Sequence, residues 1–325
     1  MLIQKKSLAN ILMIALIITI AGLLFFLYGK INEKKYDPLD AVPESSSFFI
    51  RFNSFDQLYH RINENNIWAN LLTLPGFSEF KEQSLKFDSL LNLKTKSKSS
   101  TEAQNAIISI HPNNNNIDLL LVSKLDGTLS RKALRTIFER IYGENYTTLV
   151  SDINGHQLNK LVFNQYTGSF TYAIEGGLFI GSLNANLVLE SLENLQSDQS
   201  FGYNSTFLVV EKTAGKKVDA NIFVNYKHLP DFFNQISNEY DSLNVLSKIA
   251  DWSALDLMIK KDEFLLSGYT NTNDSTLNYL NLFKDQNAQS FEMAKIIPRT
   301  ASIIQHYGIG NFKKYFDDYL HFLKK

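Results

Sequence analysis

Residues 147–182 read TTLVSDINGHQLNKLVFNQYTGSFTYAIEGGLFIGS, and this stretch decides the fold class of the chain. It contains four short runs rich in β-branched and aromatic residues, a composition typical of strands. The runs are 147–152, 157–163, 169–174 and 178–182. Asn154-Gly155 and Gly176-Gly177 each separate two of these runs, and such pairs favour two-residue hairpin turns. The stretch therefore predicts an antiparallel meander.

Similar strand patterns occur on both sides of the meander. They lie at 47–53, 106–111, 117–123, 220–226, 254–260, 264–270 and 301–307. Apolar residues at helical spacing predict helices at 77–91, 130–141 and 184–195. The run of four asparagines within 111–116 predicts a loop that connects a hairpin. The expected class is α+β, with a mostly antiparallel sheet or sheets and helices packed on one face.

A strand followed by an amphipathic helix recurs three times. The strands Phe48–Phe52, Ile222–Tyr226 and Ile303–Tyr307 each end in an aromatic residue, and apolar residues at helical spacing follow each of them. Pro43 and Pro298 both stand nine residues before the closing aromatic. Two interpretations remain open. Strand–turn–helix units look alike wherever they bury one face, or the chain contains an internal duplication whose second unit begins at residue 297.

The segment 11–28, ILMIALIITIAGLLFFLY, contains no charged residue. As a helix it would extend about 27 Å, which is close to the hydrocarbon thickness of a bilayer. We expect a retained transmembrane helix rather than a cleaved signal peptide, because no small-x-small cleavage site precedes Gly29. The expected organisation is an N-terminal tail at 1–10, the transmembrane helix at 11–28, a tether at 29–41, the α+β domain at 42–296, and a strand–helix segment at 297–325.

The orientation of this helix is harder to predict than its existence. Lys5 and Lys6 precede the span, whereas Lys30, Lys34 and Lys35 follow it, so the lysine count by itself favours a cytoplasmic domain. A very short N-terminal tail with a charged amino group favours export of the C-terminal part. We expect a single-pass protein of the inner membrane with its domain in the periplasm.

The composition excludes several classes of protein. Five lysines against one glutamate give residues 1–35 a charge of +4, which leaves −5 for the rest of a chain whose total is −1. We therefore expect no nucleic-acid partner. The chain has no cysteine, so disulfides, thiol nucleophiles and thiolate metal sites are absent.

No residue pattern points to catalysis, a cofactor or a metal. The six histidines, His60, His111, His156, His228, His306 and His321, are far apart in the sequence, and none has the spacing of paired metal ligands. The chain also lacks a G-x-S-x-G nucleophile elbow. Trp68 and Trp252 are interpreted as core or domain-junction residues, with glycan stacking as the alternative for Trp68 beside Asn66 and Asn70.

Three segments carry a family resemblance. They are Asp40-Ala-Val-Pro-Glu-Ser-Ser-Ser-Phe-Phe-Ile50, Glu175-Gly-Gly-Leu-Phe-Ile-Gly-Ser-Leu183 and Asp251-Trp-Ser-Ala-Leu-Asp-Leu257. Together they resemble the uncharacterised membrane-anchored envelope proteins of Bacteroidetes that contain domain of unknown function 3352. The resemblance implies a location in the envelope and assigns no activity and no site residues.

The expected function is therefore non-catalytic. An anchored α+β domain without a reactive constellation is typical of an interaction or scaffold module. Its partners would be the lipid bilayer, through residues 11–28, and an unknown envelope protein or glycan. The alternative is a hydrolase that acts on an envelope polymer through a carboxylate-lined cleft, because paired acids can be recognised only when the fold brings them together.

We expect a cysteine introduced near residue 200 to react with an impermeant thiol reagent in intact cells, because the domain should face outward. The chain contains no other thiol, so any labelling reports this one position. Labelling that occurs only after lysis would contradict the periplasmic assignment.

Overall fold

The computed structural model describes residues 35–53, 55–71, 73, 105–113, 116–125, 146–163, 169–197, 200–236, 242–272 and 278–324. The predicted transmembrane helix at 11–28 and the predicted helices at 77–91 and 130–141 lie outside these residues. Among the described residues, no helix is long and apolar enough to cross a membrane. Asp37–Lys325 form one compact unit, and Met1–Tyr36 form another.

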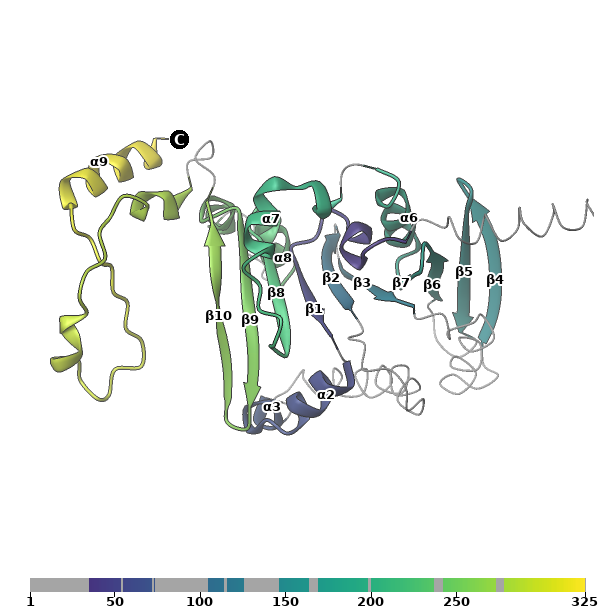
Figure 1. Cartoon of the computed structure of the whole chain (residues 1–325), viewed down its shortest axis with the longest axis horizontal. Helices are drawn as coiled ribbons and strands as arrows, with labels where there is room; N and C mark the ends of the chain where they lie inside the picture. Colours follow the sequence, from purple (N-terminus) through teal and green to yellow (C-terminus); the bar gives the residue numbers. More distant parts are fainter. Residues whose placement is uncertain are drawn as a thin grey trace, which may run out of the picture. The chain divides into compact units, whose positions relative to one another are not determined.

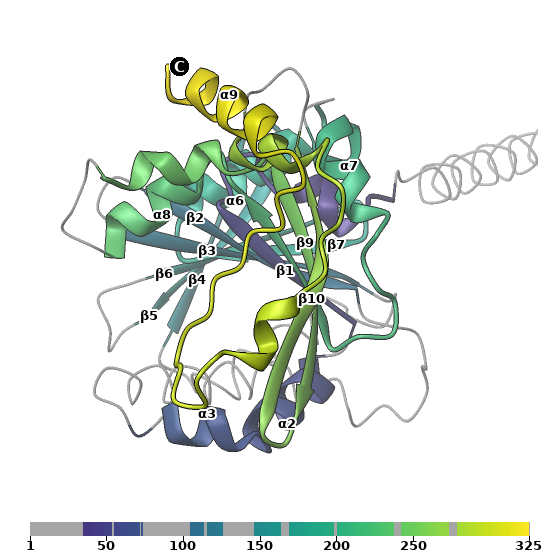
Figure 2. The same cartoon turned by 90° about the vertical axis from the view of Figure 1, so that its left-hand side faces the viewer.

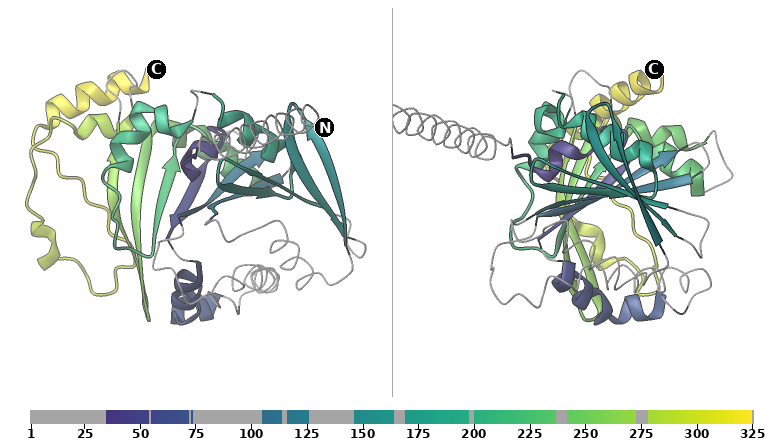
Figure 3. Two further views of the ribbon diagram at one scale, coloured as in Figure 1. Left: turned by 45° about the vertical axis from the view of Figure 1, so that its right-hand side comes forward. Right: turned by 90° about the vertical axis from the view of Figure 1, so that its right-hand side faces the viewer.

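The described residues form a ten-stranded sheet in which every neighbouring pair is antiparallel (Figure 1). The strands are β1 Phe48–Phe52, β2 Ala106–Asn113, β3 Asn116–Lys124, β4 Tyr146–Ile153, β5 His156–Phe163, β6 Ser169–Glu175, β7 Leu178–Ser182, β8 Ala220–Asn225, β9 Trp252–Lys260 and β10 Glu263–Asn271. Their order is β10-β9-β8-β1-β2-β3-β7-β6-β5-β4. Figure 3 shows the twist that accumulates across this sheet.

The predicted meander is confirmed. Strands β4 to β7 follow one another in the sheet, and the β4–β5 and β6–β7 hairpins close at Ile153↔His156 and Glu175↔Leu178. Asn154 and Gly155 have φ values of 55° and 81°, and Gly176 and Gly177 have 53° and 79°. Two consecutive positive φ values are the geometry that tight hairpin turns require and that Asn and Gly tolerate best.

The helices are α2 Phe55–Asn63, α3 Asn66–Leu71, α6 Ala185–Asn194, α7 Ser205–Glu211, α8 Leu229–Ile236 and α9 Phe312–Leu323. Short 3₁₀ turns are η1 Pro38–Ala41, η2 Phe201–Tyr203, η3 Ser242–Lys248, η4 Tyr279–Phe283 and η5 Glu292–Lys295. The α+β class is thus confirmed by a large antiparallel sheet and several helices.

Helices cover both faces of the sheet, so the prediction that they pack on one face is wrong. The Phe48 ring meets Phe232 of α8 at 4.8 Å, whereas the Phe49 ring lies 5.7 Å from Phe207 of α7. Consecutive strand residues point to opposite faces, which puts α7 and α8 on opposite faces. Figure 2 shows these two helices on either side of β9 and β10. The physical reason is that β1 carries a large apolar side chain on each face, Phe48 on one and Phe49 on the other. Each of these side chains is removed from water by a helix that packs on its face.

The core on the α7 face is aromatic. The Phe49 ring stacks on Phe223 at 4.9 Å and on Phe201 at 5.5 Å, and Trp252 stands at an angle to it at 6.3 Å. These rings join β1, β8, β9 and η2 in one cluster of buried side chains. On the other face, Leu58 of α2 packs with residues of β1, β2, β8 and β9 in a second cluster.

Residues 301–307 are not a strand, contrary to the prediction. They form no ladder with any described residue, and a segment without a paired neighbour is not a strand. The question whether 47–53 pairs with 301–307 is answered by the register, since β1 pairs with β2 and β8.

Two segment boundaries also differ from those expected. Strand β2 continues past the predicted strand end at His111, because Pro112 and Asn113, expected in the loop at 111–116, pair with Ile117 and Asn116 of β3. Pro38–Ala41, at the end of the expected tether 29–41, form η1, and its residues Leu39 and Ala41 are buried.

Replacing Phe49 with alanine should lower the free energy of unfolding by about 3–5 kcal/mol, the usual cost of removing a buried phenylalanine. Its side chain is fully buried and contacts four other aromatic rings. The matched control is Phe312→Ala, since Phe312 is 66% exposed and should change stability little. Denaturant unfolding of the two variants measures the difference, and equal losses would contradict the assigned core.

Candidate functional site

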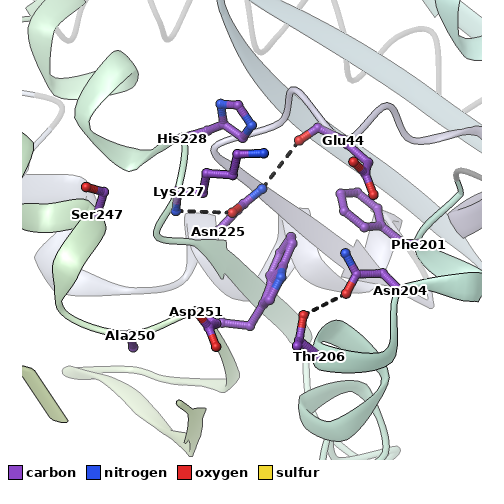
Figure 4. A pocket seen from close by; sticks show the side chains of 11 residues that line it. Glu44, Phe201, Asn204, Thr206, Asn225, Lys227, His228, Ser247, Ala250 and Asp251 are labelled. Carbon is purple, nitrogen blue, oxygen red and sulfur yellow. Dashed lines mark hydrogen bonds between the residues drawn. The ribbon is translucent and has the colours of Figure 1, made fainter. Parts of the chain in front are cut away.

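A hollow of about 220 Å³ opens where β8, β9 and the residues before β1 meet (Figure 4). Its lining comes from four segments that are distant in the sequence. The lining residues are Glu44, Phe201, Asn204, Thr206, Asn225, Lys227, His228, Ser247, Ala250, Asp251 and Trp252. This volume is below the range of about 300–1,000 Å³ that is usual for pockets of drug-sized ligands, so the hollow fits only a small molecule.

Two asparagines in the lining hold local structure. The Asn204 carboxamide caps α7, because its Oδ1 accepts hydrogen bonds from the Phe207 backbone N–H at 3.0 Å and the Thr206 hydroxyl at 2.7 Å. Asn225 ends β8, since its Oδ1 accepts from the Lys227 N–H at 3.2 Å. Its Nδ2 donates to the Glu44 carbonyl at 3.4 Å. These groups are therefore engaged in capping and turn formation.

The charged side chains that line the hollow differ in whether they have a polar or charged partner. Asp251 accepts from Asn278 Nδ2 at 3.0 Å, and His228 Nδ1 lies 3.2 Å from Asp231 Oδ2. Lys227 forms no ion pair with any residue in the described part of the chain, and Figure 4 shows its side chain reaching toward Glu44. The hollow is thus lined by one cationic side chain, Lys227, and by two carboxylates, Glu44 and Asp251. Charges of both signs are therefore present.

A second polar cluster surrounds His111, a buried residue of β2. Its Nδ1 lies 3.0 Å from the Ser45 hydroxyl and its Nε2 lies 2.8 Å from the Ser109 hydroxyl. The Ser45 hydroxyl is also 3.4 Å from Glu190 Oε1. Each ring nitrogen therefore has a hydroxyl neighbour, and one of the two must carry the proton.

Burial lowers the pKa of His111 to about 4, an effect that the nearby Asp118 opposes and His228 reinforces. Burial likewise raises the pKa of Glu190, against the hydrogen bond from Ser45. At neutral pH the His111 ring is therefore uncharged and could accept a proton from Ser45.

The His111 cluster nevertheless lacks a component of a serine nucleophile site. In such sites a carboxylate orients the imidazole through its second nitrogen, but here that nitrogen meets Ser109. The nearest carboxylate across the ladder, Asp118, accepts instead from Asn184 Nδ2 at 2.6 Å. The geometry therefore matches a satisfied core histidine better than an activated pair.

A histidine–acid pair lies elsewhere on the same sheet. His156 Nδ1 is 2.9 Å from Glu175 Oε2, and Gln196 Nε2 is 3.4 Å from the other ring nitrogen. This pair links β5 and β6 to the end of α6 and does not line the hollow. We interpret it as a structural contact.

His228 contributes to the lowered pKa of His111, so these two histidines lie within electrostatic reach of each other. His60, His306 and His321 are exposed, and the His306 ring packs on Phe291 at 5.0 Å. Trp252 is buried, as predicted for a core residue. Within the described residues, no group of three or more histidine and acidic side chains could hold a metal ion.

Comparison with models of known protein families gives no match, and comparison with curated proteins gives none either. Among solved structures the chain is similar to crystal forms III and I of TP0453. Both alignments have a TM-score of 0.39 and 12% identity, and they cover 77% of this chain and 85% and 84% of those chains. A similarity at this level supports no conclusion about function.

Stability should fall as the pH decreases from 6.5 to 4. In this window the unfolded chain takes up a proton at His111, while the folded protein, with a pKa of about 4, does not. The expected loss is on the order of 3 kcal/mol for this residue. Denaturant unfolding of the wild type, His111→Gln and the exposed control His321→Gln at pH 7 and pH 4.5 tests this. An unchanged pH dependence in His111→Gln would contradict the assignment.

Proposed function

We propose that this chain is a membrane-anchored, non-catalytic envelope protein whose α+β domain serves interaction or scaffolding. In this proposal residues 11–28 anchor it in the inner membrane, and the domain lies in the periplasm. The observation that carries the proposal is the exposed apolar surface of residues 284–324, which we call the C-terminal arm.

The apolar surface of the arm is clearest on α9. Phe312, Phe316, Leu320 and Leu323 are all exposed, and their spacing places them on one side of the helix. A different side holds the helix to the body, because Tyr315 packs on Phe283 and Phe322 packs on Tyr279 of η4. The exposed stripe is therefore not used for folding in the described structure.

The extended part of the arm adds to this surface. Ile296, Ile303, Ile304 and Tyr307 are exposed large apolar side chains of the same arm. Single exposed hydrophobic residues are common, but a gathering of this kind is typical of surfaces that bind other macromolecules. Burial of each such side chain in an interface would contribute about 1.5–3 kcal/mol before the costs of association.

The alternative is a hydrolase that acts on an envelope polymer. Its support is the hollow lined by two carboxylates, Glu44 and Asp251. Against it, Asn204, Asn225 and Asp251 already have hydrogen-bond partners in capping and turn contacts. The buried His111–Ser45 pair also lies outside the lining of the hollow.

A photo-reactive phenylalanine analogue at position 316 should capture an envelope macromolecule in native membranes. The same analogue at Tyr203, an exposed aromatic position on η2 far from the arm in sequence, should capture much less. Capture is measured by the mass shift of the full-length chain and identification of the product. Recovery of the uncrosslinked chain alone, together with cleavage of an envelope glycan or peptide by the purified protein, would favour the hydrolase.

A further inference from the structure

Strand β10 presents an unprotected edge. It is the terminal strand of the sheet and pairs only with β9 among the described residues (Figure 1). It is nine residues long, and no charged residue or proline follows Glu263 within it. Proteins usually protect such edges with charges, prolines, bulges or short strands. A long uncharged edge is a place where another strand can add.

The other half of the sheet shows how an equivalent edge is closed. The units β1–α2–β2–β3 and β8–α8–β9–β10 have the same order of strand, helix and hairpin, and β1 pairs with β8 at their junction. The third strands outward from this junction are therefore β3 and β10. The outer edge of β3 pairs with β7 from Leu120↔Ser182 to Lys124↔Leu178. No described strand occupies the corresponding edge of β10.

The C-terminal arm contains a strand-type sequence without a ladder. Residues 301–307 read ASIIQHY and lie extended and exposed, and Ile303 is 90% exposed. The segment shares with β1 a proline nine residues before its closing aromatic residue and a following amphipathic helix. In this fold β1 forms antiparallel ladders on both of its sides. The segment therefore has the sequence character of a strand that joins this kind of sheet.

Contacts with η4 and with the residues after it hold the end of this segment in place. The Tyr307 ring stacks on Phe283 at 6.0 Å, and Gln286 accepts hydrogen bonds from the backbone N–H groups of Gly310 and Asn311. These contacts hold residues 307–311 to the chain that follows η4, while Ile303 and Ile304 remain without cover. The segment thus leaves its own β10 unpaired. The Ala301 N–H donates to the Pro298 carbonyl at 3.1 Å, whereas residues 302–307 form no backbone–backbone hydrogen bond with any described residue.

We propose that residues 301–307 of one copy add as a strand to the β10 edge of a second copy of this chain. This proposal rests on the proposed interaction function and names the partner. The edge lacks a strand and the segment lacks a ladder, so each supplies the backbone hydrogen bonds that the other lacks. Reciprocal exchange of the two arms would make a closed dimer and leave no free edge for further growth.

The absence of natural cysteine makes a clean test possible. Two differently tagged full-length populations would carry Ser267→Cys on β10 and Ser302→Cys in the arm, both at exposed positions. Because each chain has one thiol, a bis-maleimide can join positions 267 and 302 only between copies. The matched control replaces Ser267→Cys with Ser151→Cys, an exposed serine on β4 at the opposite edge of the sheet. Thermal unfolding checks that each variant keeps its fold.

The expected result is a covalent 267–302 dimer formed several-fold more efficiently than the 151–302 product. Adding Ile303→Asp to the Ser302→Cys chain should abolish this difference without changing the melting temperature, because the side chain is exposed. Equal yields at both edges, or no 267–302 product, would overturn the proposal. If position 316 still captures a different envelope protein in that case, the interaction function stands without self-association. If position 316 captures nothing, both the self-association proposal and the proposed interaction function are contradicted.

Discussion

The packing of Phe49 against Phe223 joins the two halves of this molecule. One ring comes from β1 and the other from β8, and these strands lie at the junction between two strand–helix–hairpin units. Phe201, Phe207 and Trp252 close around the same ring, so η2, α7 and β9 depend on it as well. Because Phe48 points to the other face and meets α8, this short strand also explains why helices are needed on both sides.

The candidate site lies at the border of this aromatic cluster. Phe201 and Trp252 of this cluster line the hollow, and its polar residues come from the ends of strands and helices. Asn204 and Asn225 are present for a structural reason, since a helix start and a strand end both leave backbone groups that need partners. The same reasoning applies to His111, whose hydroxyl neighbours satisfy a buried ring. These polar groups therefore have structural roles in the fold. The exposed apolar side chains of the C-terminal arm, in contrast, are not used in the packing of the described structure.

Sequence patterns predicted much of the sheet because strand formation here follows local rules. Asn154-Gly155 and Gly176-Gly177 specify their hairpins through positive φ, whatever surrounds them. Helix α7 was missed because it has only seven residues, although Asn204 before Ser205 is a recognisable capping signal. The hollow was not predicted, since Glu44, Asn204, Lys227 and Asp251 are separated by long stretches of chain. Only Asn225 and Lys227, polar residues directly after an apolar strand, offered a signal.

Residue type and short-range spacing were enough to predict each strand of the sheet, the tight hairpins, the α+β class and the absence of thiol chemistry, although they also predicted a strand at 301–307 that does not form. The tertiary structure alone decided which strands became neighbours, that both faces of the sheet carry helices, and that 301–307 has no ladder. Which distant strands pair depends on which strand edges become neighbours in the folded chain, and the sequence of a single segment does not specify those neighbours. Segments 48–52 and 303–307 have similar patterns, yet one is the centre of the sheet and the other is exposed. The difference is the presence of a neighbouring edge.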